Sequence, residues 1–130
     1  MSVRQGERKT SNLEYVQDAQ ILCAHTINLC NNPNHFPEPI LANAIKQEAL
    51  TILRNVRYNL TQYTYNKNDQ DALLRYQTEV LTHIDALYAL LELAYNNKTY
   101  KIEPKAMEYW TGLIVKLEDS IKNLGLVPIC

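Results

Sequence analysis

The chain has 130 residues, 46% of them hydrophobic and 21% charged, with only three glycines and five prolines. This length and composition favour one globular, largely helical domain that needs no disulfide or metal to hold its core. Its formal net charge of -1 excludes a basic field over the whole molecule, so a polyanionic partner would have to bind a local patch.

The first predicted helix spans about residues 12–31. Ser11 and Glu14 have the spacing of a capping box, in which each side chain satisfies a free backbone N–H at a helix start. Residues 1–10 are therefore predicted to form a flexible basic arm outside the bundle. The apolar stripe of this helix is expected at Leu13, Val16, Gln20, Cys23, Ile27 and Cys30.

The second predicted helix spans about residues 38–66, after a segment rich in helix breakers. Pro39 is tolerated in the first turn because its missing N–H would have no partner there. At 100° per residue a narrow arc holds the apolar residues Leu41, Ile45, Ala49, Ile52, Val56, Leu60 and Tyr63.

The last two helices are predicted at about residues 70–97 and 104–124. Asp69 is a candidate cap for the first of them, Pro104 opens the second, and Gly125 is expected to end it in the left-handed conformation. An almost strict heptad marks the third helix. Between these two helices we expect a buried set: Leu81, Ile84, Leu87, Leu91, Trp110, Leu113, Leu117 and Ile121.

Short connections force sequential helices to run antiparallel, so residues 11–130 are predicted to form an all-α, antiparallel up-down-up-down four-helix bundle. The three cysteines, Cys23, Cys30 and Cys130, include no CxxC pair, which is typical of a reducing, cytoplasmic setting. The polar N-terminus does not resemble a signal peptide, and no segment has the length and apolarity to cross a membrane.

The chain carries no complete catalytic or metal-binding pattern. A di-iron bundle needs Glu-x-x-His pairs, which do not occur here, and Glu79 with His83 is interpreted as a surface contact. Cys23 and Cys30 lie on an apolar stripe and are interpreted as core residues. The sequence therefore predicts a protein that is not an enzyme and holds no cofactor or metal, although a pocket lined by convergent polar groups would revive an enzyme reading.

A locally basic stretch interleaved with tyrosines lies between Arg54 and Tyr76, which suits nucleic-acid binding. Lys46, Arg54 and Arg57 fall within about 80° of each other on an outward row of the second helix. The alternative is an ordinary solvated helix face. The candidate nucleic-acid-binding residues are Arg8, Lys9, Lys46, Arg54, Arg57, Lys67 and Arg75.

Three short segments carry a resemblance to a known family. They are Arg8-Lys9-Thr10-Ser11 before a helix opening Leu13-Glu14, Phe36-Pro37 between the first two helices, and Tyr109-Trp110-Thr111-Gly112-Leu113 in the last. Over essentially its whole length, the chain resembles small bacterial four-helix-bundle proteins. These include the rRNA intervening-sequence-encoded proteins and the accessory variability determinant of diversity-generating retroelements.

The resemblance implies a ring-like homopentamer and a non-catalytic accessory protein that binds RNA or an RNA–DNA template and a reverse transcriptase. The retroelement proteins are strongly basic, whereas this chain carries a net charge of -1. A second interpretation is therefore kept, an oligomeric structural or regulatory module without nucleic-acid binding. In either case, tyrosines and outward apolar residues such as Leu29 and Ile114 are expected at the interfaces between copies.

Overall fold

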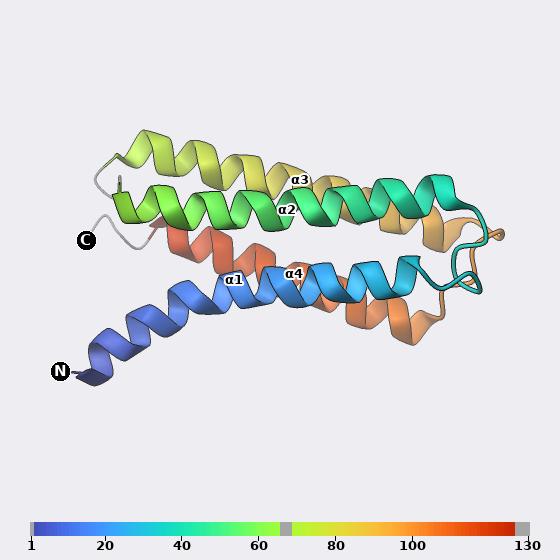
Figure 1. Cartoon of the computed structure of the whole chain (residues 1–130), viewed down its shortest axis with the longest axis horizontal. Helices are drawn as coiled ribbons and strands as arrows, with labels where there is room; N and C mark the ends of the chain where they lie inside the picture. Colours follow the sequence, from blue (N-terminus) through green and yellow to red (C-terminus); the bar gives the residue numbers. More distant parts are fainter. Residues whose placement is uncertain (1, 66–68, 127–130) are drawn as a thin grey trace.

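The computed structural model describes residues 2–65 and 69–126, and over this part of the chain it contains four helices and no strand (Figure 1). This confirms the predicted all-α four-helix fold. The helices are α1 (Ser2–Cys30), α2 (Pro39–Tyr65), α3 (Gln70–Asn96) and α4 (Pro104–Leu126).

Contacts between helices show how they are arranged. Asp18 of α1 pairs with Lys116 of α4, while Thr26, further along α1, bonds to Trp110, which comes earlier in α4. The two helices therefore run in opposite directions. α1 and α3 each pack against both α2 and α4, which places α2 and α4 diagonally across the bundle.

The connections 31–38 and 97–103 lie at the same end of the bundle (Figure 1). A backbone hydrogen bond joins them, in which the Lys101 N–H donates to the His35 carbonyl oxygen at 3.3 Å. The start of α1, the end of α2 and the start of α3 lie at the other end (Figure 1).

The start of α1 differs most from the prediction. α1 begins at Ser2, ten residues before the predicted start at residue 12, so the backbone of 2–10 is helical and the expected boundary at Ser11 is wrong. Residues 2–10 contain the good helix formers Arg, Gln, Glu and Lys and no proline, so the helix can extend before Ser11. The Ser11 and Glu14 pair then lies inside the helix and does not mark its start. These first turns extend away from the other helices (Figure 1).

The other helix ends agree with the prediction within two residues. The Asp69 cap is confirmed, because its carboxylate accepts a hydrogen bond from the Ala72 N–H at 3.0 Å. Gly125 does not end α4, which continues to Leu126, and no described glycine has a positive φ.

The core is centred on Trp110, whose side chain is fully buried and packs edge-on against His25 and Phe36. Its Nε1–H donates to Thr26 Oγ1 at 2.9 Å, and that hydroxyl donates to the Leu22 carbonyl at 2.7 Å. The indole therefore joins α4 to α1 and to the connection that carries Phe36.

Most of the predicted core residues whose side chains are described are buried. The exceptions are Gln20, which is exposed, and four half-buried residues, Ile27, Leu41, Leu81 and Leu113; the side chains of Leu13, Leu60 and Tyr63 lie outside the described part. Ile114 is buried although it was expected to face outward, and Leu29 is half-buried. Because each helix packs against two neighbours, its buried stripe is broader than one line of residues. On α1 this broader stripe also includes Tyr15, Ala19 and Leu22.

Candidate nucleic-acid interface

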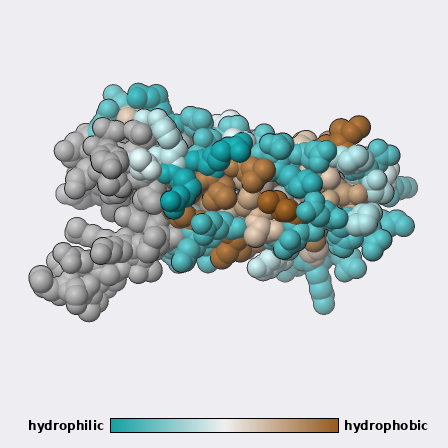
Figure 2. Space-filling view, viewed as in Figure 1, coloured by the Kyte–Doolittle hydropathy of each residue, from teal (hydrophilic) through white to brown (hydrophobic). Residues whose placement is uncertain are grey.

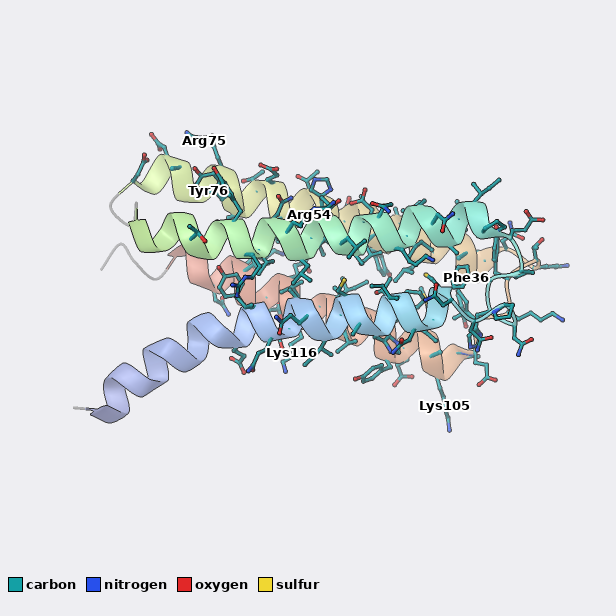
Figure 3. The ribbon with its side chains drawn as sticks, viewed as in Figure 1. Phe36, Arg54, Arg75, Tyr76, Lys105 and Lys116 are labelled. Atoms are coloured by element: carbon teal, nitrogen blue, oxygen red, sulfur yellow. The ribbon has the colours of Figure 1, made fainter. Side chains whose placement is uncertain are left out.

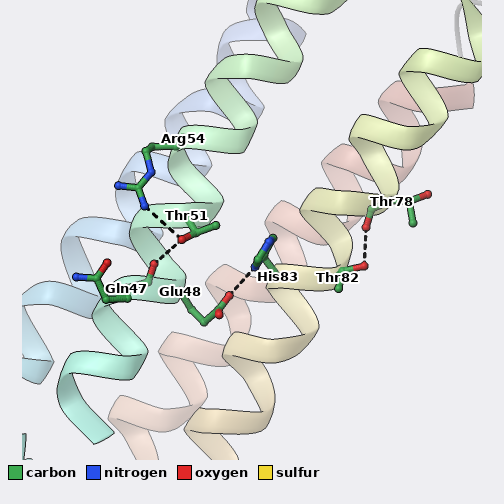
Figure 4. Close-up of polar contacts among 7 residues, drawn as sticks. All are labelled: Gln47, Glu48, Thr51, Arg54, Thr78, Thr82 and His83. Atoms are coloured by element: carbon green, nitrogen blue, oxygen red, sulfur yellow. Dashed lines mark hydrogen bonds and ion pairs between the residues drawn. The ribbon is translucent and has the colours of Figure 1, made fainter. Parts of the chain in front are cut away.

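The outer face of α2 carries exposed positive charge. Arg54 and Arg57 are both exposed and stand one helical turn apart. α2 has a single carboxylate, Glu48, whose Oε1 lies 2.8 Å from His83 Nδ1 of α3 (Figure 4). The only acidic side chain of α2 is thus turned toward α3, away from the arginines.

His83 corrects one prediction from the sequence. It was expected to contact Glu79, four residues earlier on the same helix, but its partner is Glu48 on the neighbouring helix. Periodicity shows that two residues can share a face, but it cannot show that a residue from another helix is closer.

The arginine side chains have weak competing contacts. Arg54 Nη2 lies 3.4 Å from Thr51 Oγ1, which itself donates to the Gln47 carbonyl at 2.8 Å (Figure 4). Among the described side chains, no ion pair involves Arg54, Arg57 or Arg75. Their guanidinium groups therefore remain available to an external anion.

Lys46 does not belong to the outward row that the sequence predicted. It is half-buried, and its Nζ donates to Asn31 Oδ1 at 2.8 Å. Lys46 lies on the side of α2 that faces the end of α1, which the angle around one helix cannot show. Lys46 thus links α2 to the connection that follows α1 and is less available for binding.

Two buried thiols lie near these cations. Burial raises the pKa of Cys23, with a smaller opposing effect from Arg54, and burial raises the pKa of Cys30 to about 12 despite the charge of Lys46. Both thiols stay protonated near neutral pH, where only a thiolate would be a good nucleophile. Their interpretation as core residues is confirmed.

A tyrosine pair extends the basic face onto α3. The rings of Tyr58 and Tyr76 are perpendicular, with their centroids 5.1 Å apart, and a hydrogen bond between the two side chains raises the pKa of Tyr76. Arg75 is exposed beside Tyr76 near the start of α3, whereas Arg54 lies near the middle of α2 (Figure 3). The sequence showed both tyrosines but carried no signal that they meet.

The remaining candidate residues, Arg8, Lys9 and Lys67, lie wholly or in part outside the described structure. The side chains of Arg8 and Lys9 lie outside the described part of the structure, although the backbone there belongs to α1. Lys67 falls between the described ranges. The structure therefore brings together Arg54 and Arg57, with Arg75 and the tyrosine pair on the adjoining helix.

The histidines serve separate local contacts. His25 packs edge-on against Tyr109 with centroids 4.8 Å apart, and its burial lowers its pKa. His35 Nδ1 lies 2.9 Å from the Lys101 carbonyl oxygen, at the end of the bundle.

Within 2–65 and 69–126, no three His, Cys, Asp or Glu side chains gather as metal ligands would. No helix of that part has the length and apolarity needed to cross a bilayer.

The structure defines a class, an all-helical four-helix protein with a cationic and aromatic face on α2 and α3. Comparisons of the chain with protein-family models, with curated proteins and with solved structures found no match.

Proposed function

We propose that this chain is a non-catalytic accessory protein that binds nucleic acid together with a reverse transcriptase in a diversity-generating retroelement. The observation that supports nucleic-acid binding is the pair of exposed arginines on α2, which form no ion pair with any described side chain, with Glu48 held by His83. The proposed retroelement setting and the reverse-transcriptase partner rest on the resemblance of three short segments to the accessory proteins of such elements. The nucleic acid is structured RNA or an RNA–DNA template complex.

Phosphate contacts supply most of the affinity in this proposal. The guanidinium groups of Arg54 and Arg57 can each bind two phosphate oxygens, and Arg75 adds a third contact on α3. Tyr58 is 51% exposed and offers an aromatic ring on which an unpaired base can stack. Such contacts follow the backbone of the nucleic acid, so we expect little preference for sequence.

A closed homo-oligomer, a pentamer by resemblance, would repeat this small patch around a ring. Repetition raises the effective concentration of the second and later contacts without any new contact type. Apolar side chains gather along the seam between α1 and α2 (Figure 2), and exposed apolar side chains elsewhere include Leu93, Tyr109 and Val115. Association would cover such surface.

Light scattering tests this assembly. At micromolar concentration we expect a mass several times that of the 15.0 kDa chain. A monomer would contradict it.

The exposed apolar residues also favour the second candidate function, an oligomeric structural or regulatory module, which predicts the same mass but no nucleic-acid binding.

Replacing the two α2 arginines tests the interface. Arg54→Ala with Arg57→Ala should weaken binding of a hairpin RNA and reduce the slope of log affinity against log salt by about 2, because about one phosphate contact is lost per arginine. Fluorescence anisotropy at several salt concentrations measures both quantities. The melting curve should not change, because both side chains are exposed.

The matched control removes the same charge from the diagonal helix. Lys105 and Lys122 of α4 are exposed, and Lys105 points away from the bundle (Figure 3). Lys105→Ala with Lys122→Ala should change the affinity less than about twofold, since neither lysine would contact phosphate. Equal losses in the two double variants would mean that only net charge matters, which contradicts an interface on α2.

A further inference from the structure

A hollow of about 430 Å³ lies between α3 and α4 near the end of the bundle that holds the connection 97–103. This volume falls within the range of small-ligand and side-chain pockets. Its lining includes Tyr88, Glu92, Tyr95, Met107, Glu108 and Thr111.

The hollow combines carboxylates with aromatic rings. Glu92 comes from α3 and Glu108 from α4, and among the described side chains neither takes part in an ion pair. Tyr88 and Tyr95 are each 39% exposed, so their rings are open to a ligand. Carboxylates beside accessible tyrosine rings suit a cation, which is attracted by both the negative charge and the ring faces.

α3, which forms one wall of the hollow, carries mainly negative charge. α3 carries four acidic residues, Asp71, Glu79, Asp85 and Glu92, against one basic residue, Arg75. This excess of negative charge would attract a positively charged chain toward the hollow and would repel phosphate. The hollow is therefore complementary to a basic protein segment and not to nucleic acid.

A second hollow of about 480 Å³ lies beside the first and shares Glu108 with it. Besides Glu108, it is lined by Lys105, Tyr109, Gly112 and Leu113 of α4, and a Cβ at Gly112 would meet nothing within 4 Å. Packing within the chain therefore does not require glycine here, although glycine weakens a helix interior. The missing side chain keeps the second hollow open beside Glu108.

We propose that this groove, formed by the two hollows on either side of Glu108, binds a basic segment of a partner protein, with a lysine or arginine side chain in the first hollow and an uncharged neighbouring side chain in the second, where Lys105 lies. Glu92 and Glu108 hold the cation, and Tyr88 and Tyr95 pack against it. The groove is separate from the proposed nucleic-acid face, because it lies at the end of α3 that leads into the connection 97–103, whereas Arg75 and Tyr76 lie near the start of α3 (Figure 3) and, among the described residues, α4 does not pack against α2. The chain could then hold a polyanion on one side and a basic protein on the other.

The test titrates the full-length chain with a penta-arginine peptide blocked at both ends, with penta-glutamine as the uncharged control. NMR signals of the tyrosine rings report the site, with Tyr88 and Tyr95 assigned through Tyr88→Phe and Tyr95→Phe. We expect both signals to shift with penta-arginine and not with penta-glutamine. Unchanged signals at about 1 mM peptide, where even weak sites bind, would overturn the proposal.

Two double variants with equal loss of charge separate the groove from general attraction. Glu92→Gln with Glu108→Gln should weaken peptide binding by roughly tenfold, because the contacting carboxylates are lost. Asp71→Asn with Glu79→Gln, nearer the start of α3, should weaken it less than about twofold, since distant exposed charges are screened. Equal weakening by both pairs would overturn the proposal.

Two further measurements complete the test. Gly112→Leu fills the second hollow without removing a carboxylate and should weaken peptide binding, and unchanged binding would exclude that hollow from the site.

Light scattering of the Glu92 and Glu108 double variant should show the wild-type mass. A loss of oligomer would instead assign the groove to a second copy of this chain. RNA binding should be unchanged in this variant, which separates this proposal from the one on α2.

Discussion

Trp110→Ala is expected to lower the free energy of unfolding by about 3–5 kcal/mol. The indole is 0% exposed and contacts residues from α1 and from the connection between α1 and α2. Its removal exchanges buried apolar surface for a cavity and also removes the hydrogen bond to Thr26. Urea denaturation followed by circular dichroism measures the change.

The neighbouring aromatic residue provides the control. Tyr109 is 55% exposed, and its described ring contact is with His25. Tyr109→Ala should cost less than about 1.5 kcal/mol, the size of one aromatic contact. A loss below about 1 kcal/mol for Trp110→Ala would show that the indole is not at the centre of the core.

Leu87→Ala is expected to cost about 2–5 kcal/mol. Leu87 is fully buried on α3 within the same cluster as Leu91 and Leu117. The lost methyl groups leave a cavity that helices fixed on both sides can fill only in part. The midpoint of urea unfolding should fall while its dependence on urea stays unchanged.

Leu93→Ala is the control on the same helix. Leu93 is 57% exposed, so its replacement should change the free energy of unfolding by no more than about 0.5 kcal/mol. Similar losses at Leu87 and Leu93 would mean that the buried face of α3 has been placed wrongly.

α3 shows what the sequence can predict. Both of its ends agree with the prediction within one residue, its Asp69 cap is present, and Ile84, Leu87 and Leu91 of its heptad are buried. Here the cap and the hydrophobic periodicity predict the same helix, and both depend only on residues close in the sequence. Such features predict a helix without knowledge of which other helix packs against it.

α1 shows where local signals fail. Ser11 and Glu14 fit a helix start, but the same residues are compatible with a helix interior, and the sequence alone does not choose between the two. Gln20 is exposed because the directions of α2 and α4 decide which side of α1 is buried.

The candidate site was predicted only in part, for the same reason. The exposure of Arg54, Arg57 and Arg75 agrees with the pattern of the sequence. The bond from Lys46 to Asn31 and the pair between Glu48 and His83 join residues far apart in the chain, which periodicity does not relate. The groove between α3 and α4 likewise depends on how two helices pack.

Binding of nucleic acid by the unmodified protein tests the central claim most directly. A labelled hairpin RNA is titrated with the full-length chain at about 50 mM and about 200 mM salt, and anisotropy gives the affinity. We expect binding at micromolar protein in the lower salt, and an affinity roughly tenfold or more weaker in the higher salt, because phosphate contacts release counterions. Absence of binding at micromolar protein in about 50 mM salt, where phosphate contacts are strongest, would contradict the account and leave the oligomeric module as the function.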